Sequence, residues 1–121
     1  MISRIIDASN GRIAVVSSDI PVIYDRQSAI DFAVSVGYEQ NCSGIAINKA
    51  SIAEGFFDLS TGMAGEIVQR FVNFGIRLAI IGDFSGYTSK SLRDYIYECN
   101  RTGHLYFVAD EDEAVRKLSG E

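Results

Sequence analysis

The chain has 121 residues, of which 47% are hydrophobic and 22% are charged, and its net charge at pH 7 is −5. A chain of this length fits one domain, here residues 1–121, which buries about two thirds of the surface of the unfolded chain. The acidic balance and the scattered basic residues argue against a nucleic-acid partner, because nucleic acids are bound by Lys and Arg gathered on one face.

The N-terminal residues and the cysteines indicate the compartment. Asp7 interrupts the apolar run that a signal peptide needs, and no apolar stretch reaches the ~18 residues that cross a bilayer. We therefore expect no membrane association and, by default, a cytoplasmic protein. Cys42 and Cys99 have no Cys-x-x-Cys spacing, which predicts two free, buried or half-buried thiols rather than a metal site or a disulfide.

The chain is expected to open with a β-hairpin. Two β-rich runs, 4–8 and 12–17, flank Asn10 and Gly11. Asn-Gly is the strongest short hairpin signal because both residues tolerate positive φ. Residues 20–24 are a further extended piece, and the proline inside it suits a strand start or an edge strand.

A helix and a short strand follow. Asp25 is a candidate N-cap for a helix over residues 26–36, whose apolar positions recur at helical spacing, and Gly37 supplies a stop. The run 45–47 is a short apolar strand. Residues 63–73 then carry the clearest helical pattern of the chain, with one apolar and one polar face.

The second half continues the alternation of strands and helices. Residues 76–81 are aliphatic around one arginine, which is typical of a central strand buried on both faces. The loop 82–89 leads into a helix capped by Thr88 or Ser89. The run 105–108 is the last strand, and a final helix starts with four acidic residues and ends with two basic ones, as the helix dipole favours.

This order predicts an α/β fold: a mixed, mostly parallel sheet with an N-terminal hairpin and about four helices. In open α/β sheets, binding sites gather at the carboxyl ends of the strands. Here those ends correspond to the loops 48–60, 82–89 and 109–112.

The first candidate site is the segment that contains Asp58, Ser60, Thr61 and Gly62. A hydroxyl at a helix N-terminus faces unpaired N–H groups and the positive end of the helix dipole, so it suits a phosphate or another anion. The same features describe an ordinary helix cap, which we favour for Ser60, with a regulatory serine as the second interpretation.

The second candidate is an interaction loop that contains Asp83, Phe84, Ser85 and Tyr87. Its glycines and serines lack the Gly-Lys-Ser/Thr ending of a phosphate-binding loop. If Phe84 and Tyr87 are exposed, they form a contact surface, because such residues are enriched in interfaces. If they are buried, they hold the loop in place.

The element order, the strand 45–47, the loop 58–62, the helix that ends at Asn73 and the strand 78–81 resemble the STAS or anti-sigma-factor antagonist fold over nearly the whole chain. That resemblance implies four residues before the second helix: an acid, a phosphorylatable serine, a second hydroxyl residue and a glycine. They correspond to Asp58, Ser60, Thr61 and Gly62. In this sequence Leu59 lies between the acid and the serine. The resemblance implies a regulatory or interaction module with a protein partner.

A closer resemblance is to a family of small bacterial proteins, domain of unknown function 4180. It is carried by the runs 56–62, 71–73, 82–84 and 87–92. The resemblance covers almost all of the chain and implies a bacterial cytoplasmic protein. It brings no activity and no assigned residues.

Two catalytic alternatives have little support in the sequence. His104, the only histidine, would need Ser60 or Ser85 and an acid to form a triad, so we expect a structural or solvent-facing residue. Asp58 and Asp83 could hold Mg²⁺ as in a receiver domain, but the other receiver residues are missing.

These observations lead to two functional hypotheses. The first is a non-enzymatic regulatory or interaction module with a protein partner, built around residues 58–62 and 82–89, in which Ser60 is a conditional phospho-acceptor. The second is a small-molecule or anion-binding protein, or a weak enzyme, that uses the same edge of the sheet. We expect no cofactor and no metal, and a homo-oligomer is open.

Overall fold

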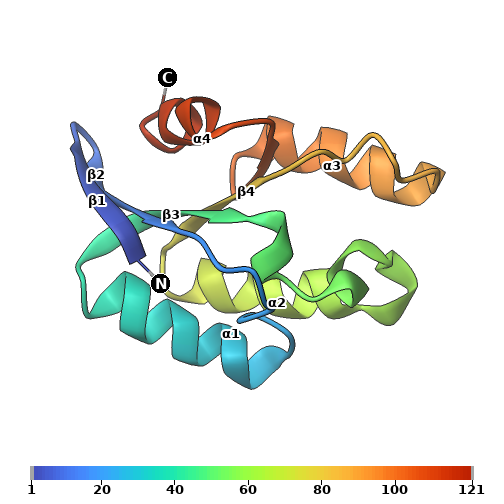
Figure 1. The fold of residues 1–121 in the computed structure, drawn as a ribbon, viewed down its shortest axis with the longest axis horizontal. Coiled ribbons are helices and arrows are strands. Elements are labelled where there is room, and N and C mark those ends of the chain that lie inside the picture. Colours follow the sequence, from blue (N-terminus) through green and yellow to red (C-terminus); the bar gives the residue numbers. More distant parts are fainter. Residues whose placement is uncertain (1, 121) are drawn as a thin grey trace.

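The computed structural model describes residues 2–120 and is built on a five-stranded mixed sheet. The strands lie side by side in chain order, with β1 antiparallel to β2 and every other neighbouring pair parallel (Figure 1). The strands are β1 (Ile2–Ala8), β2 (Gly11–Val16), β3 (Cys42–Asn48), β4 (Arg77–Ile81) and β5 (Leu105–Val108). The predicted α/β class and the N-terminal hairpin are confirmed.

Helices cover both faces of this sheet. They are α1 (Arg26–Phe32), α2 (Met63–Asn73), α3 (Lys90–Thr102) and α4 (Glu111–Leu118). The first three contribute to one apolar core, whereas α4 alone covers the second, smaller core on the opposite face. Figure 1 shows α1 and α2 below the sheet and α4 above it. Because both faces are covered, the inner strands are almost continuously apolar.

The hairpin turn differs in detail from the prediction. Of its residues only Gly11 has a positive φ, +135°, and a side chain there would collide with Ser43 of β3. Asn10 instead donates a side-chain hydrogen bond of 3.1 Å to the carbonyl oxygen of Leu118, at the end of α4. Asn10 therefore ties the turn to the last helix.

The first helix starts as predicted. Asp25 accepts a 2.7 Å hydrogen bond from the backbone N–H of Ser28, and the backbone N–H of Asp25 donates to the Ser28 hydroxyl at 3.0 Å. This reciprocal pair is a capping box.

The first helix does not end at Gly37. It continues beyond α1 as a π-helical segment, Ala33–Tyr38, and Gly37 lies inside that segment. A Cβ atom at Gly37 would clash with the side chain of Ile76, so this glycine allows close packing of the helix against the loop before β4. The prediction of a stop was wrong because the glycine serves packing and not termination.

Residues 20–24 do not form a strand. Their pairing is limited to one parallel bridge between Ile23 and Ile52, beyond the end of β3. Backbone N–H groups of Val22 and Ile23 both donate to the carbonyl oxygen of Ser51, at 2.7 and 3.1 Å. Buried Ile23 thus anchors an otherwise irregular loop.

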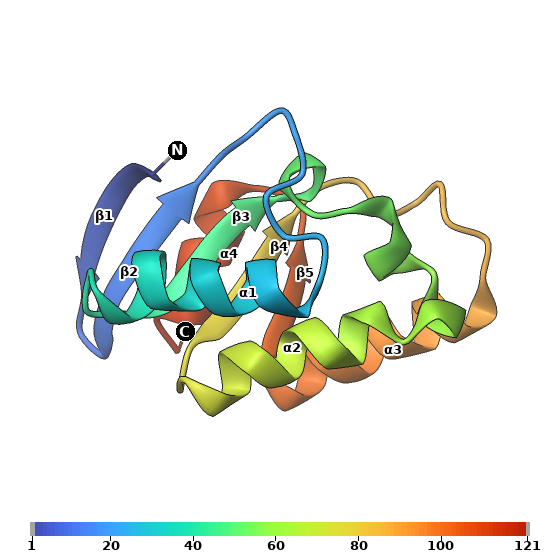
Figure 2. The same ribbon diagram turned by 90° about the horizontal axis from the view of Figure 1, so that it is seen from below.

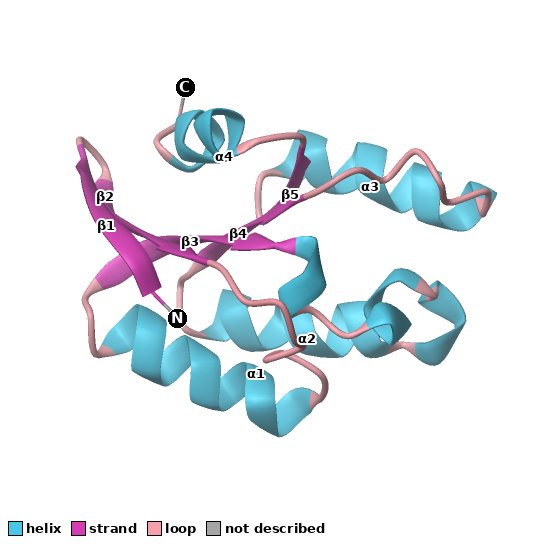
Figure 3. Cartoon of the chain, viewed as in Figure 1, coloured by secondary structure: helices cyan, strands magenta, loops and turns pink. Residues whose placement is uncertain are grey.

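The parallel strands define two ends of the molecule. The arrowheads of β2 to β5 point toward the same end in Figure 2, which we call the carboxyl edge. Its segments are 17–25, 49–62, 82–89 and 109–113. The opposite end, the amino edge, holds the hairpin turn, the C-terminal ends of the four helices and the starts of β3, β4 and β5. Figure 3 shows that several short helical turns occupy the loop between β3 and α2.

Candidate functional site

Residues Asp58, Ser60, Thr61 and Gly62 form a tight turn of their own ahead of α2. The Asp58 Oδ1 atom accepts two hydrogen bonds from Ser60, one from its hydroxyl at 2.6 Å and one from its backbone N–H at 3.1 Å. The hydroxyl of Thr61 lies 2.8 Å from the carbonyl oxygen of Asp58. All four residues are exposed.

The prediction that Ser60 caps the second helix is wrong. That helix, α2, begins at Met63, and Gly62 precedes it with a left-handed backbone, at φ 74°. Gly62 turns the chain away from the helix axis, so the Ser60 side chain faces Asp58 and makes no bond to the helix. The first N–H of α2, that of Met63, donates instead to the hydroxyl oxygen of Thr61, at 3.1 Å.

Leu59 separates Asp58 from Ser60 in the sequence but not in space. The turn brings the carboxylate within hydrogen-bond distance of the hydroxyl. The half-buried Leu59 side chain packs against the main core. The acid and the hydroxyl therefore adjoin despite the intervening leucine.

The loop after β4 repeats the same local structure. Asp83 Oδ1 accepts from the Ser85 hydroxyl at 2.6 Å and from the Ser85 backbone N–H at 2.9 Å. Such Asx-type turns are a common use of Asp two residues before a donor. In both turns the serine hydrogen bonds favour the charged carboxylate, so they lower the pKa of Asp58 and of Asp83.

Aromatic side chains hold the loops of the carboxyl edge together. The Phe57 ring lies 5.9 Å from the Phe84 ring and 5.5 Å from the Tyr87 ring, between centroids. Phe84 in turn meets Phe107 of β5 edge to face at 5.1 Å. Phe84 and Tyr87 are half-buried and pack against the main core, so their role in the structure is to hold the loop in place.

One lysine sits on this aromatic cluster. The Lys49 ammonium is 5.2 Å from the centroid of Phe57 and 5.0 Å from that of Tyr87, which are cation–π distances. It is also 3.6 Å from the Glu54 carboxylate, to which the Tyr87 hydroxyl donates at 2.7 Å. Hydrogen bonding with Tyr87 and the charge of Glu54 raise the pKa of Lys49, so it stays protonated.

Two open hollows lie along this edge. One, of about 470 Å³, is lined by the 54–59 and 86–89 segments. The other, of about 520 Å³, lies between Asp83 and Phe84 on one side and Glu113 on the other. Both carry carboxylates on their walls, so their surroundings are negative.

The hydrogen bonds of the two turns bear on the anion hypothesis. A bound phosphate needs backbone N–H groups that are free to donate. The N–H groups of Ser60 and Ser85 already donate to Asp58 and Asp83, and two carboxylates stand where the anion would lie. The arrangement therefore favours a cationic group on a partner over an anion.

The charged residues of the whole carboxyl edge also favour a cationic group over an anion. Its acidic residues are Asp19, Asp25, Glu54, Asp58, Asp83, Asp110, Glu111, Asp112 and Glu113. The only basic residue in the same segments is Lys49. Arg26 and Lys90, at the starts of α1 and α3, are paired with Glu66 and Asp94. Arg4 of β1 is paired with Glu111. With these four basic residues counted, the acidic residues of the carboxyl edge remain in excess.

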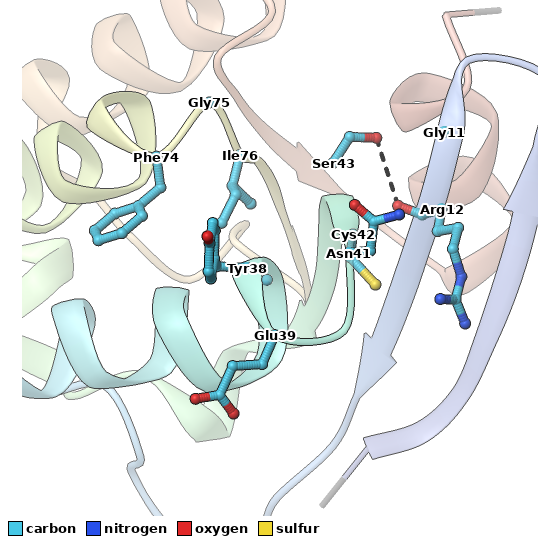
Figure 4. A pocket seen from close by; sticks show the side chains of 11 residues that line it. Gly11, Arg12, Tyr38, Glu39, Asn41, Cys42, Ser43, Phe74, Gly75 and Ile76 are labelled. Atoms are coloured by element: carbon cyan, nitrogen blue, oxygen red, sulfur yellow. Dashed lines mark hydrogen bonds between the residues drawn. The ribbon is translucent and has the colours of Figure 1, made fainter.

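A further hollow lies at the amino edge, where the sequence did not predict a site. It measures about 660 Å³ and is bounded by the hairpin, the end of the π-helical segment and the loop before β4 (Figure 4). Tyr38 and Phe74 are exposed beside it, and Arg12 belongs to its lining. In the sequence, both aromatic residues adjoin a glycine near a helix end, outside the apolar stripe, which is the one signal that could have indicated them.

His104 and the two cysteines take no part in the two Asp–Ser turns or the aromatic cluster, and Cys42 belongs to the lining of the amino-edge hollow. His104 is exposed at the start of β5, at the end opposite to Ser60 and Ser85, as expected for a solvent-facing histidine. Cys42 and Cys99 are buried and free, as predicted, and burial raises the pKa of both thiols. Within residues 2–120, no group of three or more His, Cys, Asp or Glu could hold a metal ion.

Comparison with known proteins gave one match. No curated protein and no solved structure matches the chain, so the resemblance to STAS domains stays a prediction. None of the helices in the part of the chain that the structure describes has the length and apolar character to cross a membrane. A family model described as Domain of unknown function (DUF4180) matches residues 8–118, nearly the whole chain. The chain therefore belongs to the DUF4180 family.

Proposed function

We propose that this chain is a non-enzymatic interaction module that binds a protein partner through its carboxyl edge. The observation that supports this proposal is the gathering of exposed carboxylates on loops that the aromatic cluster holds in place. A surface whose loops are already ordered loses less entropy on binding. Its negative charge favours a partner that presents Lys and Arg.

The exposed Ser60 hydroxyl is the regulatory element of the proposal. A phosphate at Ser60 would add about −1.5 to −2 charges next to the Asp58 carboxylate. The 2.6 Å hydrogen bond between the two residues would be lost, and their like charges would open the turn. Phosphorylation would thus change the shape and the charge of the edge together.

Capture experiments test the proposal. Immobilised wild-type chain is compared with Asp19→Asn/Asp112→Asn, which neutralises two exposed carboxylates of the edge. The control is Asp31→Lys, which changes the net charge by the same amount at an exposed residue of α1. Captured proteins are identified by mass spectrometry, and their binding is followed as salt is raised. We expect a specific partner whose binding weakens in the first variant only and falls with salt. Equal binding by all three chains would overturn the proposal.

The regulatory role of Ser60 is tested with two further variants in the same capture experiment. Ser60→Asp places a second carboxylate in the turn, whereas Ser60→Ala removes the hydroxyl without adding charge. Partner binding is expected to differ from that of the wild type in Ser60→Asp, because repulsion between residues 58 and 60 opens the turn. It is expected to persist in Ser60→Ala, because the backbone N–H of residue 60 still donates to Asp58. If both variants bind like the wild type, Ser60 has no regulatory role.

A further inference from the structure

The two ends of the molecule carry opposite charge. The carboxyl edge is acidic, as described above, and the charged residues near the amino edge are mostly basic. Those residues are Arg12, Arg70, Arg77, Arg101, Arg116 and Lys117, against Asp7, Glu39 and Glu98. Three of the basic residues form ion pairs within the chain, Arg12 with Asp7, Arg101 with Glu98 and Arg116 with Glu113, and basic residues remain in excess at this edge. The chain is therefore polarised along the direction of its parallel strands.

Several exposed apolar side chains lie at the same two ends, whereas Tyr97 is exposed on α3. Tyr38 and Phe74, 75% and 41% exposed, stand beside the hollow of the amino edge. Ile20 and Tyr24, 68% and 55% exposed, lie in the loop 17–25 of the carboxyl edge. Large apolar side chains that remain in water mark contact surfaces when they cluster.

The shapes of the two ends are complementary as well. The amino edge is hollowed, with a volume of about 660 Å³ between its loops. At the carboxyl edge, the loop 17–25 stands out from the sheet in Figure 2. That loop presents Asp19 next to Ile20, which is an acidic and apolar tip. The hollow is lined by the aromatic residues Tyr38 and Phe74, and its charged residues are one arginine, Arg12, and one glutamate, Glu39.

We infer that the amino edge binds the carboxyl edge of a second copy of this chain, so that copies assemble head to tail. A two-fold dimer through either edge would bring like charges together, whereas the head-to-tail contact pairs opposite ones. Because such a contact is heterologous, each copy keeps one free end and the assembly grows as an open chain. The inference rests on the proposed function, since it names the amino edge of another copy as the basic partner.

The test is analytical ultracentrifugation of the full chain over a range of concentrations and salt. The wild type is expected to grow beyond a dimer as concentration rises and to return toward monomer in high salt. Tyr38→Glu/Phe74→Glu blocks the amino edge, and Asp19→Lys/Ile20→Lys blocks the carboxyl edge. Each blocked variant alone is expected to be monomeric, and an equimolar mixture is expected to form a dimer and nothing larger.

Tyr97→Glu, on the exposed outer side of α3, is the matched control and should associate like the wild type. Circular dichroism verifies that each variant is folded. The concentration series of the wild type tests the inference even if a variant does not fold. A wild type that stays monomeric at millimolar concentration would overturn the inference. A wild type that stops at a dimer, together with an equimolar mixture of the two blocked variants that stays monomeric, would overturn it too. A monomeric chain that still captures a different basic protein would leave the proposed function standing without this inference.

Discussion

Asp58 and Asp83 show how one local structure is used twice at the same edge of a sheet. In each case the aspartate accepts from both the hydroxyl and the N–H of the serine two residues later. The sequence places Ser60 and Ser85 in loops, but not in these turns. The reason is that the Ser60 geometry depends on the left-handed backbone of Gly62, which a helix-start pattern does not reveal.

The first prediction concerns the titration of the two aspartates. Their pKa values should lie below the ordinary value of about 3.9, and Ser60→Ala should raise that of Asp58 while leaving Asp83 unchanged. Since the folded pKa is lowered, the stabilisation from each turn is present above the ordinary pKa and is lost as pH falls through the folded value. Carboxyl carbon NMR across acidic pH measures both residues. Identical titration of Asp58 in wild type and Ser60→Ala would contradict the geometry.

Arg77 is a second residue whose role depends on distant parts of the chain. It donates to the carbonyl oxygens of Gly103 at 3.1 Å, Lys117 at 3.2 Å and Leu118 at 3.3 Å. These carbonyls belong to the ends of α3 and α4, and the guanidinium also lies over the Tyr106 ring. One arginine thus satisfies the ends of two helices.

Arg77→Ala should therefore lower the free energy of unfolding by about 2–3 kcal/mol, because several charge-assisted hydrogen bonds to partly buried carbonyls are lost at once. The exposed Arg116→Ala is the control and should change it by less than about 0.5 kcal/mol. Urea denaturation followed by circular dichroism measures both. A difference between the two variants that is within error would show that the Arg77 contacts add no stability.

At the scale of elements, the periodicity of the apolar residues predicted the strands and helices, because each element buries one or two of its faces. The helix 63–73, the strand before Gly82 and the acidic start of α4 lie where their apolar or charge patterns indicate. The errors fall where tertiary contacts decide. Residues 20–24 pair through a single bridge, and the first helix runs past Gly37 as a π-helix. Neither contact has a signal in the local sequence.

Two glycines in helical segments should respond to alanine in opposite ways. Gly37→Ala should destabilise the fold by about 1–3 kcal/mol, because the new Cβ meets the buried Ile76 side chain. Adding Ile76→Val removes the clashing Cδ1 atom and should recover part of the loss. Gly65→Ala, in open space on α2, should stabilise by about 0.5–1 kcal/mol. Equal effects of the two alanines in urea denaturation would contradict the packing role of Gly37.

At the scale of the whole molecule, chain order predicted the carboxyl edge and could not predict the amino edge. Alternating strands and helices place the loops 82–89 and 49–62 at one end of a parallel sheet. The hollow of the amino edge combines three segments that are distant in the chain: the hairpin, the residues around Tyr38 and those around Phe74. Their meeting depends on how the helix ends pack, which no single segment determines.

The central claim is that the carboxyl edge is a binding surface, and site-specific photo-crosslinking in the native cell tests it most directly. The photoreactive residue p-benzoylphenylalanine is placed at Gly86, where an added Cβ atom has no neighbouring atom within 4 Å, or at Tyr97 on the outer face of α3 as the control. We predict a discrete crosslinked protein from position 86, either a second copy or a different basic protein, and only background from position 97. Equal, diffuse background from both positions would contradict the claim.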